Sequence, residues 1–217
     1  MPAAGNVRII GGAWRGRKLI VPPATALRPT ADRAREALFN RLLHGFVDRG
    51  FRLVGATVAD VCAGTGAMGF EALSRGAAMV TFIERDAGVA AAIEAQISAF
   101  AAEDRARVVR ADAAAPPPAA RACDLVIIDP PFASGTAEPA LRALGSRGWY
   151  APNALVVVET DADKADPAPQ GLTVIDSRAY GRIKFLFYAA ENLPPASSAT
   201  GRSSVGAPGA AADGAGS

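Results

Sequence analysis

Residues 58–69 read Val58-Ala-Asp-Val-Cys-Ala-Gly-Thr-Gly-Ala-Met-Gly69, and this stretch decides the fold. A short apolar run ends at Val61, and Gly64, Gly66 and Gly69 follow in the pattern G-x-G-x-x-G. The next residues have a helical pattern, so a buried strand, a tight loop and a helix are predicted. Glycine is needed where the backbone turns sharply or approaches a ligand closely, because a Cβ atom would clash there. This arrangement is typical of the nucleotide-cofactor corner of a Rossmann-like α/β sheet.

The glycine spacing alone leaves the cofactor open. It fits a methyltransferase, a dinucleotide-dependent dehydrogenase, or a loop that binds nothing. Glu84, at the expected end of the next strand, could bind a ribose in either enzyme class. Asp60 favours a methyltransferase, because a carboxylate just before the loop suits a cationic sulfonium better than a pyrophosphate.

The composition sets wider limits on the function. The chain has 217 residues, half of them hydrophobic, which is enough for one well-buried α/β domain plus an appendage. Two cysteines, Cys62 and Cys123, and one histidine, His44, exclude a disulfide framework and argue against a Cys/His zinc site. Both cysteines are expected to be buried packing residues. No apolar stretch is as long as a membrane span, so we expect a cytoplasmic protein without a membrane partner.

Charge is distributed unevenly, although the net charge is only +2. Residues 1–55 contain ten Lys and Arg against three acids, whereas the rest of the chain contains thirteen basic and eighteen acidic residues. A basic front end on a nearly neutral enzyme favours a polyanionic partner. A charged face that serves only solubility is the alternative.

The front end is expected to form a basic β-hairpin followed by a helix. Residues 7–21 have the pattern of two short strands around a glycine-rich turn that carries Trp14. This tryptophan could stack on a base or anchor the hairpin to the core. The helix is expected over residues 28–43 with Thr30 as its N-cap, and it could present arginines to phosphates.

Strand and helix patterns alternate from residue 57 onward. Strands are expected over 57–61, 79–83, 106–110, 123–128 and 154–159, and helices over 67–75, 87–101 and 137–147. Such alternation predicts a mostly parallel sheet with helices on both faces. Two further strands, 172–180 and 183–188, are separated only by Gly181-Arg182, so an antiparallel hairpin should close a seven-stranded sheet. That ending is unusual for a dehydrogenase.

Composition also suggests where the folded part begins and ends. We expect an N-terminus (1–6), a basic extension (7–55), a cofactor domain (56–192) and an Ala/Gly/Ser-rich tail (193–217). The tail contains too little apolar surface to offset its ordering entropy, so it is expected to be disordered, as is the N-terminus.

A second motif, Asp129-Pro-Pro-Phe132, follows a buried strand and indicates the chemistry. Its prolines restrict φ and lack a backbone donor, so rigid carbonyl groups remain available. At the end of a central strand the motif would lie beside the glycine loop. A carboxylate and a proline carbonyl could each accept a hydrogen bond from an exocyclic amine while Phe132 stacks on its ring. This suits methyl transfer to an aromatic amine, because the acceptors favour the pyramidal nitrogen needed for attack, and no metal is required.

These motifs resemble those of S-adenosylmethionine-dependent amino-methyltransferases, and the front end narrows the resemblance. Residues 8–19, 28–39 and Glu71-Ala-Leu-Ser-Arg-Gly76 resemble the bacterial family that methylates N2 of a guanine in small-subunit ribosomal RNA. The match extends over about residues 7–189, nearly the whole folded part. The resemblance implies a Rossmann-like class I methyltransferase that acts on this RNA or on the assembling small subunit. A monomer is expected.

The resemblance also implies roles for individual residues. Glu84 would accept both ribose hydroxyls, and Asp112 would meet the adenine amino group. The residues expected to bind the cofactor are Asp60, Cys62, Ala63, Gly64, Gly66, Glu84 and Asp112. The residues expected to be catalytic are Asp129, Pro130, Pro131 and Phe132, of which Asp129, Pro130 and Phe132 would hold the guanine amine and ring. Those expected to bind RNA are Arg8, Trp14, Arg15, Arg17, Lys18, Arg28, Arg33 and Arg35, with Tyr180, Arg182 and Lys184 as further candidates.

Three alternatives stay open from the sequence. The same site could methylate another nucleic acid, for instance adenine N6 of DNA, because the second motif recognises amines and not sugars. The chain could also be a dinucleotide-dependent oxidoreductase or an inactive RNA-binding module. If guanine N2 is the target, its base should be splayed out or flipped, since that nitrogen faces the minor-groove edge of a stacked helix.

Overall fold

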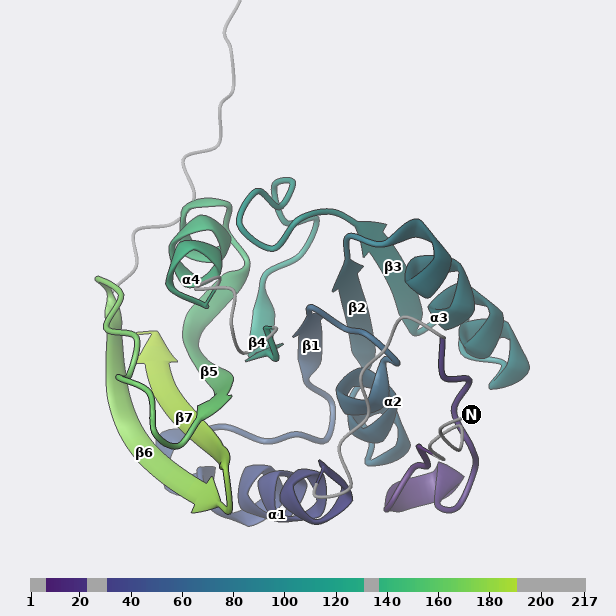
Figure 1. The fold of residues 1–217 in the computed structure, drawn as a ribbon, viewed down its shortest axis with the longest axis horizontal. Coiled ribbons are helices and arrows are strands. Elements are labelled where there is room, and N and C mark those ends of the chain that lie inside the picture. Colours follow the sequence, from purple (N-terminus) through teal and green to yellow (C-terminus); the bar gives the residue numbers. More distant parts are fainter. Residues whose placement is uncertain (1–6, 23–30, 131–136, 191–217) are drawn as a thin grey trace, which may run out of the picture.

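The computed structural model describes residues 7–22, 31–130 and 137–190. They form a seven-stranded sheet with the strand order β3-β2-β1-β4-β5-β7-β6 (Figure 1). The strands are β1 (Thr57–Val61), β2 (Met79–Glu84), β3 (Ala106–Arg110), β4 (Cys123–Ile128), β5 (Tyr150–Asp161), β6 (Leu172–Tyr180) and β7 (Ile183–Ala190). The helices are α1 (Ala31–His44), α2 (Ala67–Ser74), α3 (Ala87–Ala99) and α4 (Ala137–Ser146), with the short 3-10 helices η1 (Gly12–Trp14) and η2 (Val47–Arg49).

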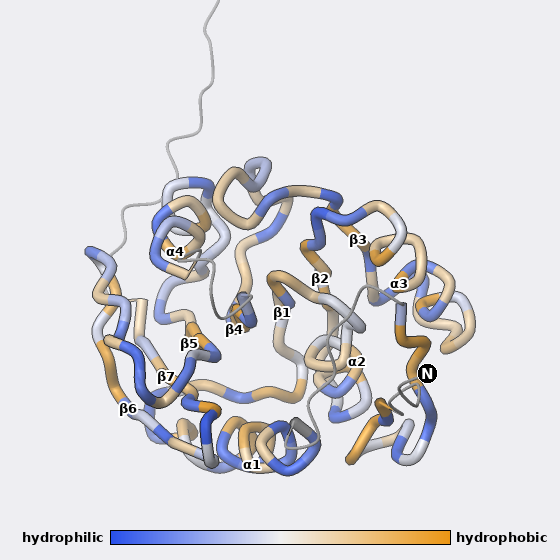
Figure 2. The backbone as a smooth tube through the Cα atoms, viewed as in Figure 1, coloured by the Kyte–Doolittle hydropathy of each residue, from blue (hydrophilic) through white to orange (hydrophobic). Residues whose placement is uncertain are grey.

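The parallel part of the sheet is covered on both faces, as the strand–helix alternation predicts. Successive side chains of a strand point to opposite faces. Leu125 and Ile127 of β4 therefore join the core beneath α1, α2 and α3, whereas Val126 and Ile128 join the core beneath α4. Figure 2 shows the long apolar stretches in the central strands, β2 among them. None of the helices within the described ranges is long and apolar enough to span a lipid bilayer.

The closing hairpin is confirmed, and one strand is longer than predicted. β7 pairs antiparallel with both β5 and β6, while β1 to β5 pair in parallel. β5 begins at Tyr150 and not at residue 154, because a bulge opposite β4 lets the chain continue through Pro152. Asn153 adopts a φ of +62° at this bulge. A local apolar pattern does not show such an irregularity.

The front end forms less β-structure than predicted. We call residues 7–22 the front segment. Its two arms run antiparallel, with hydrogen bonds from Ile9 N to Arg17 O and from Leu19 N to Val7 O, but they form only one isolated bridge, between Arg8 and Lys18. The two expected strands are therefore absent from this described segment, and η1 occupies the turn. The segment instead bonds to side chains of α2 and α3, which take the place of strand pairing.

Helix α1 packs against the closing hairpin as well as the sheet. The apolar side of the helix is buried, including Leu38 and Phe39. Arg41 Nε donates to Asp176 Oδ2 of β6 at 2.8 Å, so an ion pair fixes the helix to the far edge of the sheet. The same continuous core includes Val7 of the front segment and the central strands.

Gly12 is expected to be far less tolerant of alanine than Gly16. Both residues have positive φ, +75° and +85°, so alanine would be conformationally strained at either position. Only at Gly12 would the added Cβ collide with the Ser74 carbonyl, whereas at Gly16 it meets nothing within 4 Å. Gly12→Ala should therefore lower the free energy of unfolding by at least about 1 kcal/mol more than Gly16→Ala, measured by urea denaturation. Equal losses would show that the front segment does not pack on α2 as described.

Candidate functional site

The predicted cofactor residues meet at the carboxyl ends of neighbouring strands. β1 lies between β2 and β4 and pairs with both in parallel (Figure 1). Asp60 lies near the end of β1, Glu84 ends β2, and Asp129 directly follows β4. The Asp129 amide donates to Val61 O at 3.1 Å, which fixes the start of the second motif against β1. In open α/β sheets this edge is the usual place for a ligand.

The glycine loop, residues 62–66, has a backbone that depends on glycine. Gly64 and Gly66 have φ values of +53° and +73°. A Cβ on Gly66 would lie 2.8 Å from the Phe70 ring, so a side chain is excluded there. Cys62 also has a positive φ, +59°, which is unusual for a residue with a side chain. The loop thus brings bare backbone to the edge of the sheet, and α2 begins directly after it.

Asp60 is 1% exposed and binds the helix that directly follows this loop. Its Oδ2 accepts a hydrogen bond from Gly69 N at 2.8 Å, which joins the end of β1 to the first turn of α2. Burial raises the pKa of Asp60 to about 8; the Gly69 hydrogen bond opposes this shift, and the carboxylates of Asp129 and Glu84 add to it. A positive charge bound nearby would favour the ionised form of this carboxyl group.

Glu84 is held in place by two backbone amides. Its Oε2 accepts from Gly64 N at 3.0 Å and its Oε1 accepts from Asp86 N at 2.9 Å. Each carboxylate oxygen can accept a further hydrogen bond, so two neighbouring hydroxyl groups could be bound together. Asp112, after β3, is exposed, and its Oδ1 accepts from Ala114 N at 2.8 Å. Asp112 therefore shapes its own loop at the margin of the site.

The site is acidic. Burial first, and then the carboxylates of Glu84, Asp129, Asp60 and Asp112, raise the pKa of the half-buried Cys62 thiol to about 12. Such a thiol stays protonated and is a poor nucleophile. Among the residues that the structure describes, no group of His, Cys, Asp and Glu is arranged to hold a metal ion. A cluster of carboxylates repels a pyrophosphate and attracts a cation.

The second motif is only partly within the described ranges. Asp129 is half-buried and Pro130 is buried. Pro131 and Phe132 lie outside the described residues, as does Arg28 of the front end. The stacking role of Phe132 stays a prediction.

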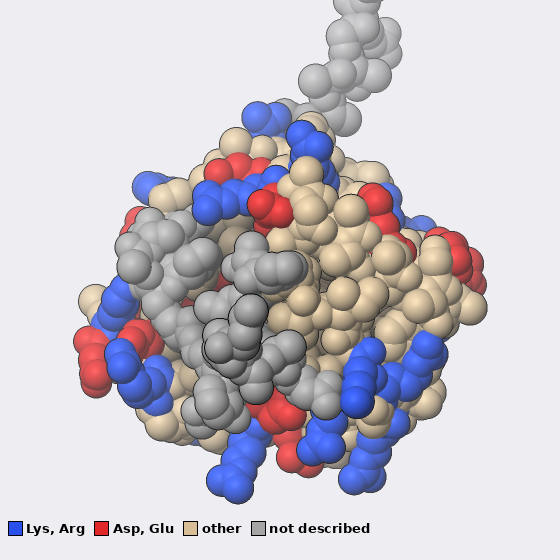
Figure 3. All heavy atoms as spheres, turned by 45° about the vertical axis from the view of Figure 1, so that its right-hand side comes forward, with Lys and Arg blue, Asp and Glu red and all other residues tan. Residues whose placement is uncertain are grey.

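Most of the expected RNA-binding residues of the front end are exposed cations, whereas Arg35 is buried. Figure 3 shows Lys and Arg gathered along the lower part of one face. The exposed members of the expected set are Arg8, Arg15, Arg17, Lys18 and Arg33. Arg17 is also fixed to α3, because its guanidinium donates to Ala99 O at 2.7 Å and lies 3.7 Å from the centroid of the Phe100 ring.

Arg35 corrects one prediction. It is only 3% exposed, and its guanidinium donates to Arg8 O at 2.8 Å and to Asp32 Oδ1 at 2.9 Å. A buried guanidinium held in this way does not meet a phosphate, so the expected RNA contact of Arg35 conflicts with its location. The reason is that Arg35 lies on the inner side of α1, facing the buried Glu71 of α2.

Trp14 was expected either to stack on a base or to anchor the front end to the core, and the structure shows the contact with the core. Its ring packs against Phe100, with centroids 4.7 Å apart, and anchors the front segment to the core. On the closing hairpin, Arg182 and Lys184 form ion pairs with Asp161 and Asp166 at 3.1 and 2.5 Å. Their charges are therefore partly neutralised within the protein.

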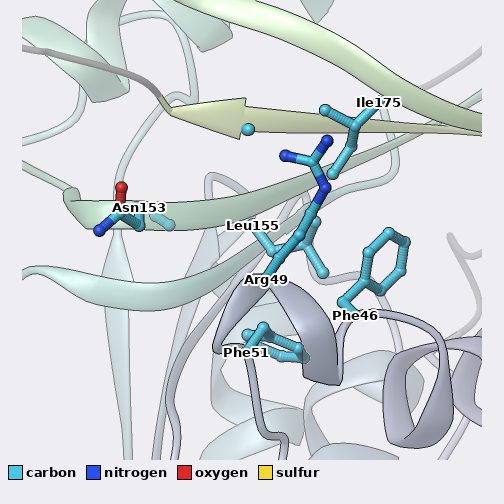
Figure 4. A pocket seen from close by; sticks show the side chains of 8 residues that line it. Phe46, Arg49, Phe51, Asn153, Leu155 and Ile175 are labelled. Carbon is cyan, nitrogen blue, oxygen red and sulfur yellow. The ribbon is translucent and has the colours of Figure 1, made fainter.

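A separate cavity of about 150 Å³ lies at the opposite end of β5 (Figure 4). It is lined by Phe46, Arg49, Phe51, Asn153, Ala154, Leu155, Ile175 and Ala189. None of the residues predicted for the cofactor or for RNA lines it. The cavity therefore does not belong to the site at the carboxyl ends of the strands.

The chain is similar to proteins of known family over nearly all of its described part. The family described as conserved hypothetical protein 95 matches residues 7–189. Ribosomal RNA small subunit methyltransferase D of Haemophilus influenzae is 38% identical over 190 residues, which cover 86% of this chain and 95% of the relative. The protein of the same name from Escherichia coli strain K12 is also 38% identical, with 87% and 92% covered.

Solved structures agree with this relationship. A proposed methyltransferase of Escherichia coli has a TM-score of 0.70 at 37% identity, with 86% of this chain and 99% of that chain covered. A proposed methylase of Haemophilus influenzae has a TM-score of 0.70 at 34% identity, with 87% and 100% covered. The similarity includes the front segment as well as the acidic edge of the sheet. The chain is therefore a class I methyltransferase and belongs to the conserved hypothetical protein 95 family, together with the ribosomal RNA small subunit methyltransferase D proteins.

Proposed function

We propose that the protein transfers the methyl group of S-adenosylmethionine to N2 of a guanine in small-subunit ribosomal RNA. The observation that carries this proposal is the 38% identity to ribosomal RNA small subunit methyltransferase D over most of both chains. Because the matched residues, 7–189, include the basic front segment, the similarity extends beyond the cofactor half of the fold.

The residues at the ends of β1 and β2 fit S-adenosylmethionine by their chemistry. Glu84, fixed by two amides, suits the pair of ribose hydroxyls, and Gly64 and Gly66 allow close approach of the backbone. A cation bound nearby would favour the ionised form of the buried Asp60, whose pKa is raised to about 8 in its absence. When bound, the cofactor supplies a methyl group on a positively charged sulfur. Once ionised, Asp60 would also repel the anionic pyrophosphate of a dinucleotide, whereas Glu84 suits a ribose in either cofactor.

Asp129 and the carbonyl group of Pro130 are the proposed acceptors for the exocyclic amine. Asp129 follows β4 beside β1, so the amine would lie at the same edge of the sheet as the glycine loop. Two acceptors on its hydrogens favour a pyramidal nitrogen, whose lone pair is then available for attack. The Asp129 carboxylate also stabilises the positive charge that develops on the nitrogen, and it can receive the proton that the methylated amine loses.

Transfer of labelled methyl groups tests the function. The acceptors are unmodified small ribosomal subunits, naked ribosomal RNA and duplex DNA, each incubated with the protein and labelled S-adenosylmethionine. We expect label in the ribosomal RNA, recovered after digestion as N2-methylguanosine. Label in DNA alone would keep the reaction class and overturn the substrate. Binding of NAD(H) without binding of S-adenosylmethionine would overturn both.

Asp129→Ala is expected to reduce turnover at least about a hundredfold, because one acceptor for the amine is lost. The affinity for S-adenosylmethionine should change much less, since other residues are proposed to hold the cofactor. Turnover with saturating RNA and calorimetric titration of the cofactor measure the two effects. Glu138→Ala, at an exposed position of α4, is the control and should behave as the native protein. Normal turnover of Asp129→Ala would remove this residue from the mechanism.

Glu84→Gln is expected to weaken binding of S-adenosylmethionine about tenfold or more. The substitution keeps the size of the side chain but replaces one acceptor oxygen by a donor, which also faces a backbone amide. Calorimetric titration without RNA measures the change. Asp112→Asn is the comparison, because Asp112 is exposed and caps its own loop. If Asp112→Asn weakened binding more than Glu84→Gln, the proposed ribose site would be misplaced.

The exposed cations of the front segment are expected to give RNA binding its salt dependence. Replacing both Arg15 and Lys18 by Gln should lower the affinity for RNA and reduce the slope of log K against log salt by about one for each lost phosphate contact. Cofactor affinity should not change. RNA titrations over a range of KCl concentrations measure the slope. Arg142→Gln, at an exposed position of α4, is the matched control; an equal effect there would show that RNA binding is not localised to the front segment.

A further inference from the structure

Gln96 of α3 contacts two parts of the chain that serve different ligands of the proposed reaction. Its Oε1 accepts a hydrogen bond from Ile20 N of the front segment at 2.8 Å. Its Nε2 donates to Thr65 O of the glycine loop at 3.3 Å. The side chain is 2% exposed, so a single buried amide group connects the segment with the loop.

The first arm and the turn of the front segment are attached to α2, the helix that begins at the glycine loop. Glu71, which is fully buried, accepts from Ile10 N and from Gly11 N at 2.8 Å each. Ser74 Oγ accepts from Trp14 N at 2.9 Å and donates to Gly11 O at 2.5 Å. The stretch Glu71-Ala-Leu-Ser-Arg-Gly76, which carries part of the family resemblance, thus holds the front segment against α2.

The position of Gln96 gives the two parts a shared hydrogen-bond partner. A buried amide group that loses one hydrogen-bond partner is left with an unpaired polar atom, which is unfavourable. Thr65 lies between Gly64 and Gly66, so a ligand that orders the glycine loop also fixes the Thr65 carbonyl. The fixed carbonyl orients the Gln96 amide, and this amide in turn holds Ile20.

We propose that Gln96 is a positioning residue that couples cofactor binding in the glycine loop to ordering of the front segment for RNA. The inference rests on the proposed function, because it takes S-adenosylmethionine as the ligand of the loop and RNA as the ligand of the segment. Coupling between two sites is reciprocal. The cofactor-loaded protein therefore binds RNA more tightly, by the same factor by which RNA tightens cofactor binding.

Hydrogen–deuterium exchange of residues 7–22 tests the coupling without any need for turnover. In the native protein, S-adenosylmethionine should slow exchange in this segment, and it should lower the Kd for a ribosomal RNA fragment at least about fivefold. Gln96→Met keeps a long, unbranched side chain but removes both hydrogen bonds. In this variant, exchange in the segment should no longer respond to the cofactor, and the ratio of the two Kd values should approach one. Glu94→Met, at an exposed position of the same helix, should behave as the native protein.

A purely structural role for Gln96 gives a different result. It would lower the Tm of Gln96→Met but leave the response of the segment and the Kd ratio unchanged, and this outcome would overturn the proposal. If Gln96→Met does not fold, Gln96→Glu replaces it, since glutamate keeps the acceptor for Ile20 N and lacks the donor for Thr65 O. Gln96→Glu should then lose the coupling, and a variant that keeps the coupling would overturn the proposal.

If the native protein does not bind S-adenosylmethionine at all, the proposed function fails and the coupling fails with it. If the native protein binds S-adenosylmethionine but exchange in residues 7–22 does not change, the coupling alone is refuted.

Discussion

The hydrogen bond from Gly69 N to Asp60 Oδ2 fixes the corner on which the cofactor half of the protein depends. It joins a central strand to the helix after the glycine loop, and the geometry of the loop follows from these two fixed ends. The bond requires a buried carboxyl group, whose pKa is raised to about 8. It also requires glycine at position 69, where a Cβ would collide with the Phe82 ring. A group kept in an unfavourable environment is typical of a functional site, where a ligand compensates the cost.

The far end of the same helix depends on a second buried carboxylate. Glu71 accepts two amides of the front segment and pairs with Arg75 at 2.7 Å, while Arg35 Nε lies 4.0 Å away. Removing such an acid would leave buried cations and amides without their partner, which destabilises a protein strongly. Helix α2 is thus held by Asp60 at the cofactor edge and by Glu71 at the front segment. The part of the chain proposed to bind RNA and the part proposed to bind the cofactor share one rigid element.

The parallel sheet could be predicted because its signals are local. Buried strands appear as short apolar runs, and the glycine pattern after β1 marks both the turn and the ligand edge. The early start of β5 could not be predicted, because it depends on a bulge at Asn153 that only pairing with β4 stabilises. The strands of the front segment were predicted wrongly for a related reason. Their polar backbone groups find partners on α2 and α3, which lie far away in the sequence.

The sequence indicates where a residue lies when a motif fixes the backbone, as at Gly64 and Gly66, but residue type alone does not show whether a charged side chain is exposed. Arg35 resembles a surface residue in the sequence, yet its partners place it inside the protein. Gln96 belongs to neither sequence motif, although it occupies a core position of the apolar helix side formed by Val89, Ile93 and Ile97. A polar residue at such a position needs hydrogen-bond partners, so it marks a specific contact and not merely a gap in the pattern. Arg35 and Arg41 contribute to the positive charge of residues 1–55, but both are used in ion pairs within the protein. The attraction for RNA proposed here must come from the smaller set of cations that remain exposed, among them Arg15 and Lys18.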